Sequence, residues 1–255
     1  MQTRIEDRRS FGVAALRLLL GASLLQHAAA ATALTGSVKW SARPWLQRLD
    51  EASSAVAAGS VRPTQWQDEV TAVLGGMDLP DLLRSLDFDA LARGASFPLQ
   101  GEGMQRLYFP DADGKLQPLR FRPYLFTLRR DTAVVPHGHH NMTTMHMVLA
   151  GRARVRHFDR LADSDTHMLL RPASDVEAGP GVVTTISDDR HNVHWMQSLS
   201  DQVFMFNIGV YQLKPDQPFG ERDYVDPLAG VTVADGSLRA PRLERAAAYA
   251  KYGRG

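Results

Sequence analysis

The chain has 255 residues, and its 29 basic and 28 acidic side chains give a formal net charge of +1. This balance, with no basic stripe along any segment, argues against a nucleic-acid partner. The chain contains no cysteine, which excludes a disulfide framework, a thiolate metal site and a cysteine nucleophile. A catalytic metal would therefore need histidine and carboxylate ligands.

Residues 1–33 have the features of an export signal. Arg8 and Arg9 form a twin-arginine pair, an apolar run follows over residues 11–25, and residues 31–33 give an Ala-Thr-Ala cleavage pattern. The run is too short for a stable membrane span. We predict twin-arginine export to the periplasm. If this segment is instead an amphipathic helix, the protein stays in the cytoplasm.

Residues 34–100 are predicted to form a helical segment that packs on the rest of the chain. Pro63 suits the first turn of a helix, and Gly75 and Gly76 suit its end. Apolar side chains recur there at helical spacing. They are Trp45, Leu46, Leu49, Ala52, Trp66, Val70 and Val73.

From residue 101 the pattern changes to short strands separated by turns, which indicates a sandwich or barrel. After Pro215 the chain is polar and is predicted to be loop-like, and residues 227–255 form a tail with a short alanine-rich helix over 243–249. The predicted strands are 106–109, 116–121, 124–128, 142–149, 153–158, 167–170, 181–187, 193–196 and 203–210.

Eight of the nine histidines lie between His137 and His194, and three of them have the spacing of metal ligands. His137 and His139 are two residues apart, so on an extended chain both imidazoles face the same side. His194, on a later strand, is the candidate third ligand. Three ligands on one face leave coordination positions open for substrate.

Two motifs around these histidines resemble the cupin family. Pro136-His137-x-His139, with Gly151 closing a hairpin, is similar to the first cupin motif, and Asn192-x-His194 is similar to the second. Ordinary cupins place a glutamate between the second histidine and the hairpin glycine. Thr144 stands at that position, so the fourth ligand is missing.

A three-histidine site resembles the thiol dioxygenases, of the cysteamine dioxygenase and plant cysteine oxidase type. The stretch His137-x-His139-x-x-Met142-Thr143, followed by Leu149-x-Gly151 and Val155-x-x-Phe158-Asp159, is similar to that family. The segment from Gly220 to Tyr224 faintly resembles the family's Gly-Arg-x-Cys-x-Tyr segment, although the cysteine is absent.

The resemblance covers residues 104–226 and implies a mainly β fold, a cupin (RmlC-like jelly-roll) barrel over 101–226 with an N-terminal helical segment. It implies Fe(II), or another divalent metal, on His137, His139 and His194. The implied reaction oxidises a small thiol or an N-terminal cysteine with O2 to a sulfinic acid. The partners are then a small-molecule substrate and O2. A homodimer is compatible with the sequence, but no segment marks an interface.

Three further side chains are candidates for the catalytic site. Tyr124 and Tyr224 are able to hydrogen-bond a substrate, and His146 shares the strand face of Thr144. His146 either lines the pocket or packs in the barrel. His191 has the wrong strand parity for a ligand, but a bulge would let it replace His194.

The other histidines and the large apolar side chains are assigned structural roles. His140 has opposite parity to the ligand pair and is predicted to point away from the metal. His157 and His167 are predicted to be ordinary strand-surface residues. The remaining apolar set is predicted to form barrel core. It consists of Met142, Met145, Met147, Trp195, Met196, Phe204, Met205 and Phe206.

Two other functions stay open at this point. One is a cupin dioxygenase that acts on a ring or a diketone. The other is a non-catalytic periplasmic cupin that binds a metal or a small ligand. The fold alone does not separate them, because cupins host many chemistries. A nucleophilic hydrolase is disfavoured, since the chain has no Gly-x-Ser-x-Gly element.

Overall fold

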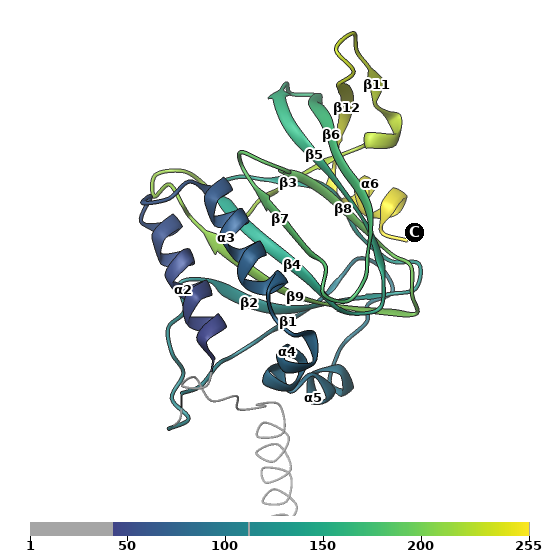
Figure 1. Cartoon of the computed structure of the whole chain (residues 1–255). Helices are drawn as coiled ribbons and strands as arrows, with labels where there is room; N and C mark the ends of the chain where they lie inside the picture. The colour runs from purple at the N-terminus through teal and green to yellow at the C-terminus, as the bar shows by residue number, and fades with distance from the viewer. Residues whose placement is uncertain (1–42, 112, 255) are drawn as a thin grey trace, which may run out of the picture. The chain divides into compact units, whose positions relative to one another are not determined.

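A computed structural model describes residues 43–111 and 113–254 (Figure 1). The predicted export signal, residues 1–33, lies outside the described residues. Within the two described ranges, no helix has both the length and the apolar character that crossing a bilayer requires.

Four helices precede the first strand, as the sequence predicts for this region. They are α2 (Pro44–Ala57), α3 (Pro63–Gly75), α4 (Leu79–Leu86) and α5 (Phe88–Arg93). Prolines occupy the first turn of α2, α3 and α4, where the missing N–H costs nothing. Asp78 caps α4, since its carboxylate accepts a hydrogen bond from the backbone N–H of Asp81 at 3.0 Å.

The rest of the chain is mainly antiparallel β-sheet. The strands are β1 (Gly103–Arg106), β2 (Arg122–Arg129), β3 (Ala133–His139), β4 (Met142–Ala150), β5 (Ala153–Asp163), β6 (His167–Ala178), β7 (Val183–Ser187), β8 (Val193–Ser198), β9 (Gln202–Tyr211), β10 (Arg222–Val225), β11 (Val231–Thr232) and β12 (Leu238–Leu243). A 3-10 turn, η2 (Pro227–Ala229), and a last helix, α6 (Arg245–Tyr252), complete the described elements.

The strand order defines a jelly roll. One sheet has the order β1-β2-β9-β4-β7, and the other has the order β10-β3-β8-β5-β6-β12-β11. The eight consecutive strands β2 to β9 therefore pair as nested antiparallel partners: β2 with β9, β3 with β8, β4 with β7, and β5 with β6. This nesting is the double Greek key of the cupin-type barrel. The predicted fold class is confirmed.

The turn between β4 and β5 shows why the hairpin needs glycine. Gly151 has a φ of +79°, in the left-handed region. An added Cβ would lie 2.2 Å from the backbone oxygen of Gln202. A side chain at this position would therefore force the turn between β4 and β5 away from the start of β9.

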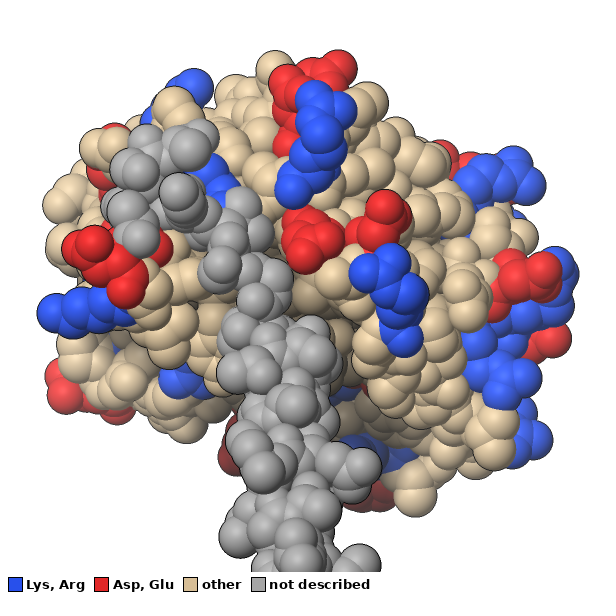
Figure 2. Space-filling model, turned by 90° about the horizontal axis from the view of Figure 1, so that it is seen from below, with Lys and Arg blue, Asp and Glu red and all other residues tan. Residues whose placement is uncertain are grey.

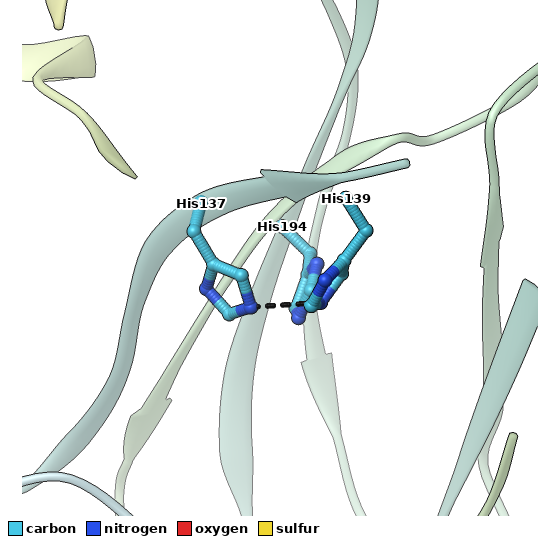
Figure 3. Close-up of side chains that lie close together, drawn as sticks. All are labelled: His137, His139 and His194. Carbon is cyan, nitrogen blue, oxygen red and sulfur yellow. Dashed lines mark hydrogen bonds between the residues drawn. The ribbon is translucent and has the colours of Figure 1, made fainter. Parts of the chain in front are cut away.

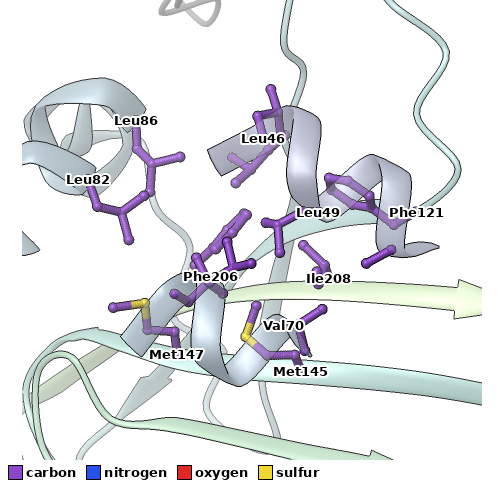
Figure 4. Packing of buried hydrophobic residues seen from close by; sticks show 14 of the residues in the cluster. Leu46, Leu49, Val70, Leu82, Leu86, Phe121, Met145, Met147, Phe206 and Ile208 are labelled. Carbon is purple, nitrogen blue, oxygen red and sulfur yellow. The ribbon is translucent and has the colours of Figure 1, made fainter. Parts of the chain in front are cut away.

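The helices α2 and α3 cover the outer face of the five-stranded sheet (Figures 1 and 4). Alternate side chains of β9 point to opposite faces: Phe206 packs outward against the helices, whereas Met205 points into the barrel. The large apolar set assigned to core is buried throughout. Part of it, including Met145 and Met147, lies between helices and sheet and not inside the barrel.

Three secondary-structure predictions are wrong. The strand predicted at 106–109 lies earlier, at Gly103–Arg106, and residues 107–109 are not in a strand. Residues 116–121 form no strand, and only an isolated bridge joins Pro110 to Leu116. The segment after Pro215, predicted to be loop-like, contains β10 and β12, which join the second sheet. β10 pairs with β3, and its polar residues Arg222 and Asp223 lie opposite His139 and Gly138. Backbone pairing, not side-chain hydrophobicity, makes this segment a strand.

Figure 2 shows acidic and basic side chains mixed over one face of the molecule, with much uncharged surface between them. No large area of one sign is visible on that face. This pattern agrees with the near-zero net charge.

Candidate metal centre

A bulge in β3 turns two histidines into the barrel. Val134 lies opposite Met196 of β8, the register then shifts, and His137 lies opposite His194. Without the shift, His137 would continue the outward parity of Val135, which packs under α6. With it, His137 faces the same side as His194. The extra residue thus aims the imidazole at the barrel interior.

Gly138, between the two histidines of β3, allows close approach of β8. A Cβ there would lie 2.5 Å from Oδ1 of Asn192 and 3.2 Å from Cγ2 of Val193. Asn192 in turn donates a hydrogen bond from Nδ2 to the backbone oxygen of His139 at 2.8 Å. The asparagine of the Asn-x-His motif therefore fixes the strand that carries His194 against the strand that carries the other two histidines.

The three histidines converge as the spacing predicts (Figure 3). Their ligand nitrogens lie within 4.8 Å of one another. The Nε2 atoms of His137 and His139 are 2.9 Å apart, and the ring centres of His137 and His194 are 4.3 Å apart. Nδ1 of His137 lies 2.6 Å from the backbone oxygen of Val135. This contact assigns the proton to Nδ1 and leaves the Nε2 lone pair directed at the cluster.

All three imidazoles are held neutral. His137 and His194 are fully buried, and burial lowers the pKa of both well below the ordinary value. Burial, assisted by the charge of Arg222, lowers the pKa of His139 to about 3. Neutral imidazole is the form that binds a metal, so protons do not compete at neutral pH.

The donor set fits a divalent transition metal. Three neutral nitrogen ligands suit iron, zinc, copper or nickel, and no carboxylate belongs to this cluster among the described residues. The Nδ1 atoms of His139 and His194 are buried and have no hydrogen-bond partner. A metal would be held by His137, His139 and His194.

Thr144 stands at the position of the usual glutamate, and its hydroxyl forms hydrogen bonds with β9. Its hydroxyl donates to the backbone oxygen of Ile208 at 2.6 Å and accepts from Nδ2 of Asn207 at 2.8 Å. Asn207 donates also to the backbone oxygen of Met145. The threonine therefore ties β4 to β9 and has no role as a ligand.

Substituting Thr144→Val should lower the free energy of unfolding without changing the metal content. The valine has the same shape, but it leaves the buried amide of Asn207 without one acceptor, at a cost of about 1–3 kcal/mol. Urea denaturation measures the first effect and elemental analysis the second. A loss of metal in the folded variant would show that Thr144 takes part in metal binding.

The three candidate catalytic residues lie in different relations to the cluster. The ring centres of Tyr224 and His137 are 6.0 Å apart. The ring centres of His146 and His194 are 5.9 Å apart. Tyr124 lies on the inner face of β2, packed against Phe126, with no contact to the three histidines. His146 and Tyr224 are therefore the nearer candidates.

The remaining histidines do not join the cluster. His191 has a φ of +60°, stacks on His157 with ring centres 4.9 Å apart, and donates its backbone N–H to Asp159. His140 is exposed and bonds the carboxylate of Asp223, away from the cluster as predicted.

The prediction that His157 is a surface residue is wrong. Its exposed fraction is 3%, because it lies directly opposite His194 and shares its inward face. His167, at the start of β6, is partly exposed, and its ring nitrogen bonds the hydroxyl of Thr166.

Buried neutral histidines should make the fold sensitive to acid. Burial lowers the pKa of His146 and of His157 to about 3, against about 6.5 in the unfolded chain. Between these values the unfolded state binds more protons, so the free energy of unfolding should fall as the pH drops below about 6.5. The expected slope is up to about 1.4 kcal/mol per pH unit for each histidine. Urea denaturation across this range measures it. The fall should be shallower in His157→Gln and unchanged in His167→Gln; equal slopes in all three proteins would refute the assignment.

Sequence reasoning missed the charged residues beside the cluster. Arg222 lies opposite His139, forms an ion pair of 2.6 Å with Glu102, and donates to the hydroxyl of Tyr249. These residues and Tyr224 line a cavity of about 660 Å³. The cavity lies where β10 and the start of β1 approach each other. None of the three histidines lines this cavity, but Arg222 and Tyr224, which do, are the register partners of His139 and His137.

Comparison with protein-family models and with curated proteins gives no match to this chain. Among solved structures, procruciferin, the 11S globulin of Brassica napus, is similar with a TM-score of 0.33 and 16% identity over 47% of this chain and 28% of that chain. Ectoine synthase from P. lautus has a TM-score of 0.31 and 13% identity over 45% of this chain and 67% of that chain. KdgF from Halomonas sp. has a TM-score of 0.31 and 13% identity over 46% of this chain and 84% of that chain. The match spans little more than a quarter of the 11S globulin chains. The fold assignment rests on the strand order, which defines a cupin-type jelly roll. A cluster of three histidines lies in this jelly roll.

Proposed function

We propose that the protein is a non-haem iron oxygenase that oxidises a small thiol, or an N-terminal cysteine, to a sulfinic acid. The observation that carries this proposal is the set of three converging neutral histidines in which a hydrogen-bonded threonine replaces the usual acidic ligand. A neutral ligand set leaves the negative charge to be supplied by the substrate. A thiolate supplies that charge, and this favours a thiol over a neutral ring or diketone.

The proposed reaction is balanced without a further reductant. RSH and O2 give RSO2H: two sulfur–oxygen bonds form, sulfur is oxidised by four electrons, and both oxygen atoms are reduced. Iron(II) held by the three imidazoles would supply the one-electron chemistry that O2 requires. The residues of the chain would keep water out and position the substrate.

Two neighbouring groups support these roles. His146 is buried and stays neutral at pH 7, so it would act through hydrogen bonding from its ring and not as a base. The ring of Tyr224 lies 6.0 Å from that of His137 and Tyr224 also lines the 660 Å³ cavity, which supports a role at the approach to the cluster. We propose Tyr224 as a residue that positions the substrate.

Oxygen uptake by the iron-reconstituted protein tests this function. The substrates are cysteine, cysteamine, 3-mercaptopropionate and a peptide with an N-terminal cysteine, with product masses determined. The proposal expects uptake with one of them and a mass gain of two oxygen atoms. Full iron occupancy without uptake for any thiol would contradict it and favour a non-thiol dioxygenase or a binding protein.

We also propose that the protein is exported through the twin-arginine route to the periplasm, because Arg8 and Arg9 precede an apolar run and an Ala-x-Ala pattern. Fractionation of cells that express the chain with a C-terminal tag should recover a shortened form in the periplasm. An Arg8→Lys, Arg9→Lys variant should stay inside the cell. Export of both forms alike would contradict this route.

A further inference from the structure

Two arginines stack on tyrosines at the inner face of the five-stranded sheet. The guanidinium of Arg106 lies 5.0 Å from the ring centre of Tyr124, and that of Arg122 lies 4.9 Å from the ring centre of Tyr211. Cation–π contact fixes the plane of a guanidinium and leaves its N–H edge free to donate. Two arginines are thus held in place without their hydrogen-bonding capacity being used.

Gly209 makes room for one of these pairs. A Cβ at Gly209 would lie 2.8 Å from the hydroxyl of Tyr211, so the tyrosine ring lies back over the glycine on the same face. Gly209 is the register partner of both Arg122 and Thr144. The ring of Tyr211 therefore lies across the row of the sheet that contains Thr144.

A second row connects the other pair to the histidines. Across the sheet, Arg106 lies opposite Tyr124, Tyr124 opposite Asn207, and Asn207 opposite His146. His146 in turn faces His194 across the barrel. The arginine–tyrosine pairs and the three histidines therefore share the inner surface of the barrel, with Arg122 exposed at its rim and the other three side chains partly buried.

The two guanidiniums lack a counter-charge. Among the described residues, no carboxylate forms an ion pair with Arg106 or Arg122, in contrast to Arg222, which pairs with Glu102. Burial raises the pKa of Tyr211, and the positive charges of Arg122 and Arg106 oppose this rise. A group of cations without an internal anion is suited to binding an external one.

We propose that Arg106 and Arg122, with the hydroxyls of Tyr124 and Tyr211, form a subsite that binds a carboxylate of the substrate. The planar guanidinium matches a carboxylate in a two-point hydrogen bond, and tyrosine hydroxyls donate to the same oxygens. The inference rests on the proposed function, in which the thiol end of the substrate reacts at the three histidines. Within the thiol class it selects acids over amines.

Calorimetric titration of the full chain, both metal-free and iron-loaded without oxygen, tests the subsite apart from turnover. The probes are 3-mercaptopropionate, its neutral amide of equal size, and cysteamine, which carries the opposite charge. We expect the acid to bind about 10- to 100-fold more tightly than the amide, as charge-assisted hydrogen bonds do. The amide and cysteamine should bind alike or not at all.

Three variants locate the effect. Arg122→Gln and, independently, Arg106→Gln should each remove at least about tenfold of the preference for the acid. Arg120→Gln should retain it, because Arg120 is exposed like Arg122 but does not share the stacking of Arg122 on Tyr211. Equal binding of acid and amide, or an equal loss in the Arg120 variant, would overturn the subsite. Selective binding of the acid without oxygen uptake would uphold the subsite and refute the oxygenase. Oxygen uptake with cysteamine as fast as with the acid would uphold the oxygenase and refute the subsite.

Discussion

Replacing His194 by alanine is expected to lower the affinity for iron by more than about 100-fold and to abolish oxygen uptake. The change removes one of three ligands, and altering even the partners of metal ligands costs about 10–100-fold in affinity. His194 is buried opposite His137, so no other described residue takes its place in the cluster. Elemental analysis after dialysis measures the first effect, and an oxygen electrode measures the second.

His167→Ala is the matched control, because His167 lies on β6, is partly exposed and is absent from the cluster. It should retain full iron content. The far-ultraviolet circular dichroism of both variants should match that of the parent chain. Retention of iron by a folded His194→Ala variant would show that the metal lies elsewhere.

Phe206→Ala should be the most damaging change in the core, with a loss of about 3–5 kcal/mol in the free energy of unfolding. Phe206 is fully buried on the outer face of β9, and its ring meets the edge of Trp45 from α2 at 6.1 Å between ring centres (Figure 4). Removing the ring leaves a cavity between sheet and helices. Urea denaturation measures the loss.

Leu99→Ala, at a position that is 67% exposed, should change stability by less than about 0.5 kcal/mol. A small effect of Phe206→Ala, similar to that of this control, would mean that the helical segment contributes little to the stability of the barrel.

The sequence predicts most of the fold because its strands have strong local signals. Val203 to Val210 is apolar except for Asn207, and Gly151 marks a hairpin that only glycine permits. The strand at Arg222 has no such signal. It is short and polar, and backbone pairing with β3 and β12 makes it a strand, so no local pattern reveals it.

Strand register and bulges decide which features of the site the sequence predicts and which it does not. The His-x-His spacing places His137 and His139 on one side, but only the bulge in β3 sends that side into the barrel. His157 appeared to be a surface residue because a histidine does not reveal which face of its strand is buried. Tyr211 and Arg122 were missed since their contact depends on the pairing of β2 with β9, which alternation does not predict.

X-ray absorption at the iron edge of the reconstituted protein tests the central claim most directly. Three imidazole nitrogens should bind a single iron per chain, the imidazole scattering should weaken in His194→Ala, and addition of a thiol substrate should introduce a sulfur ligand. A spectrum of the parent protein that shows no histidine coordination, or one that is unchanged in His194→Ala, would contradict the three-histidine centre.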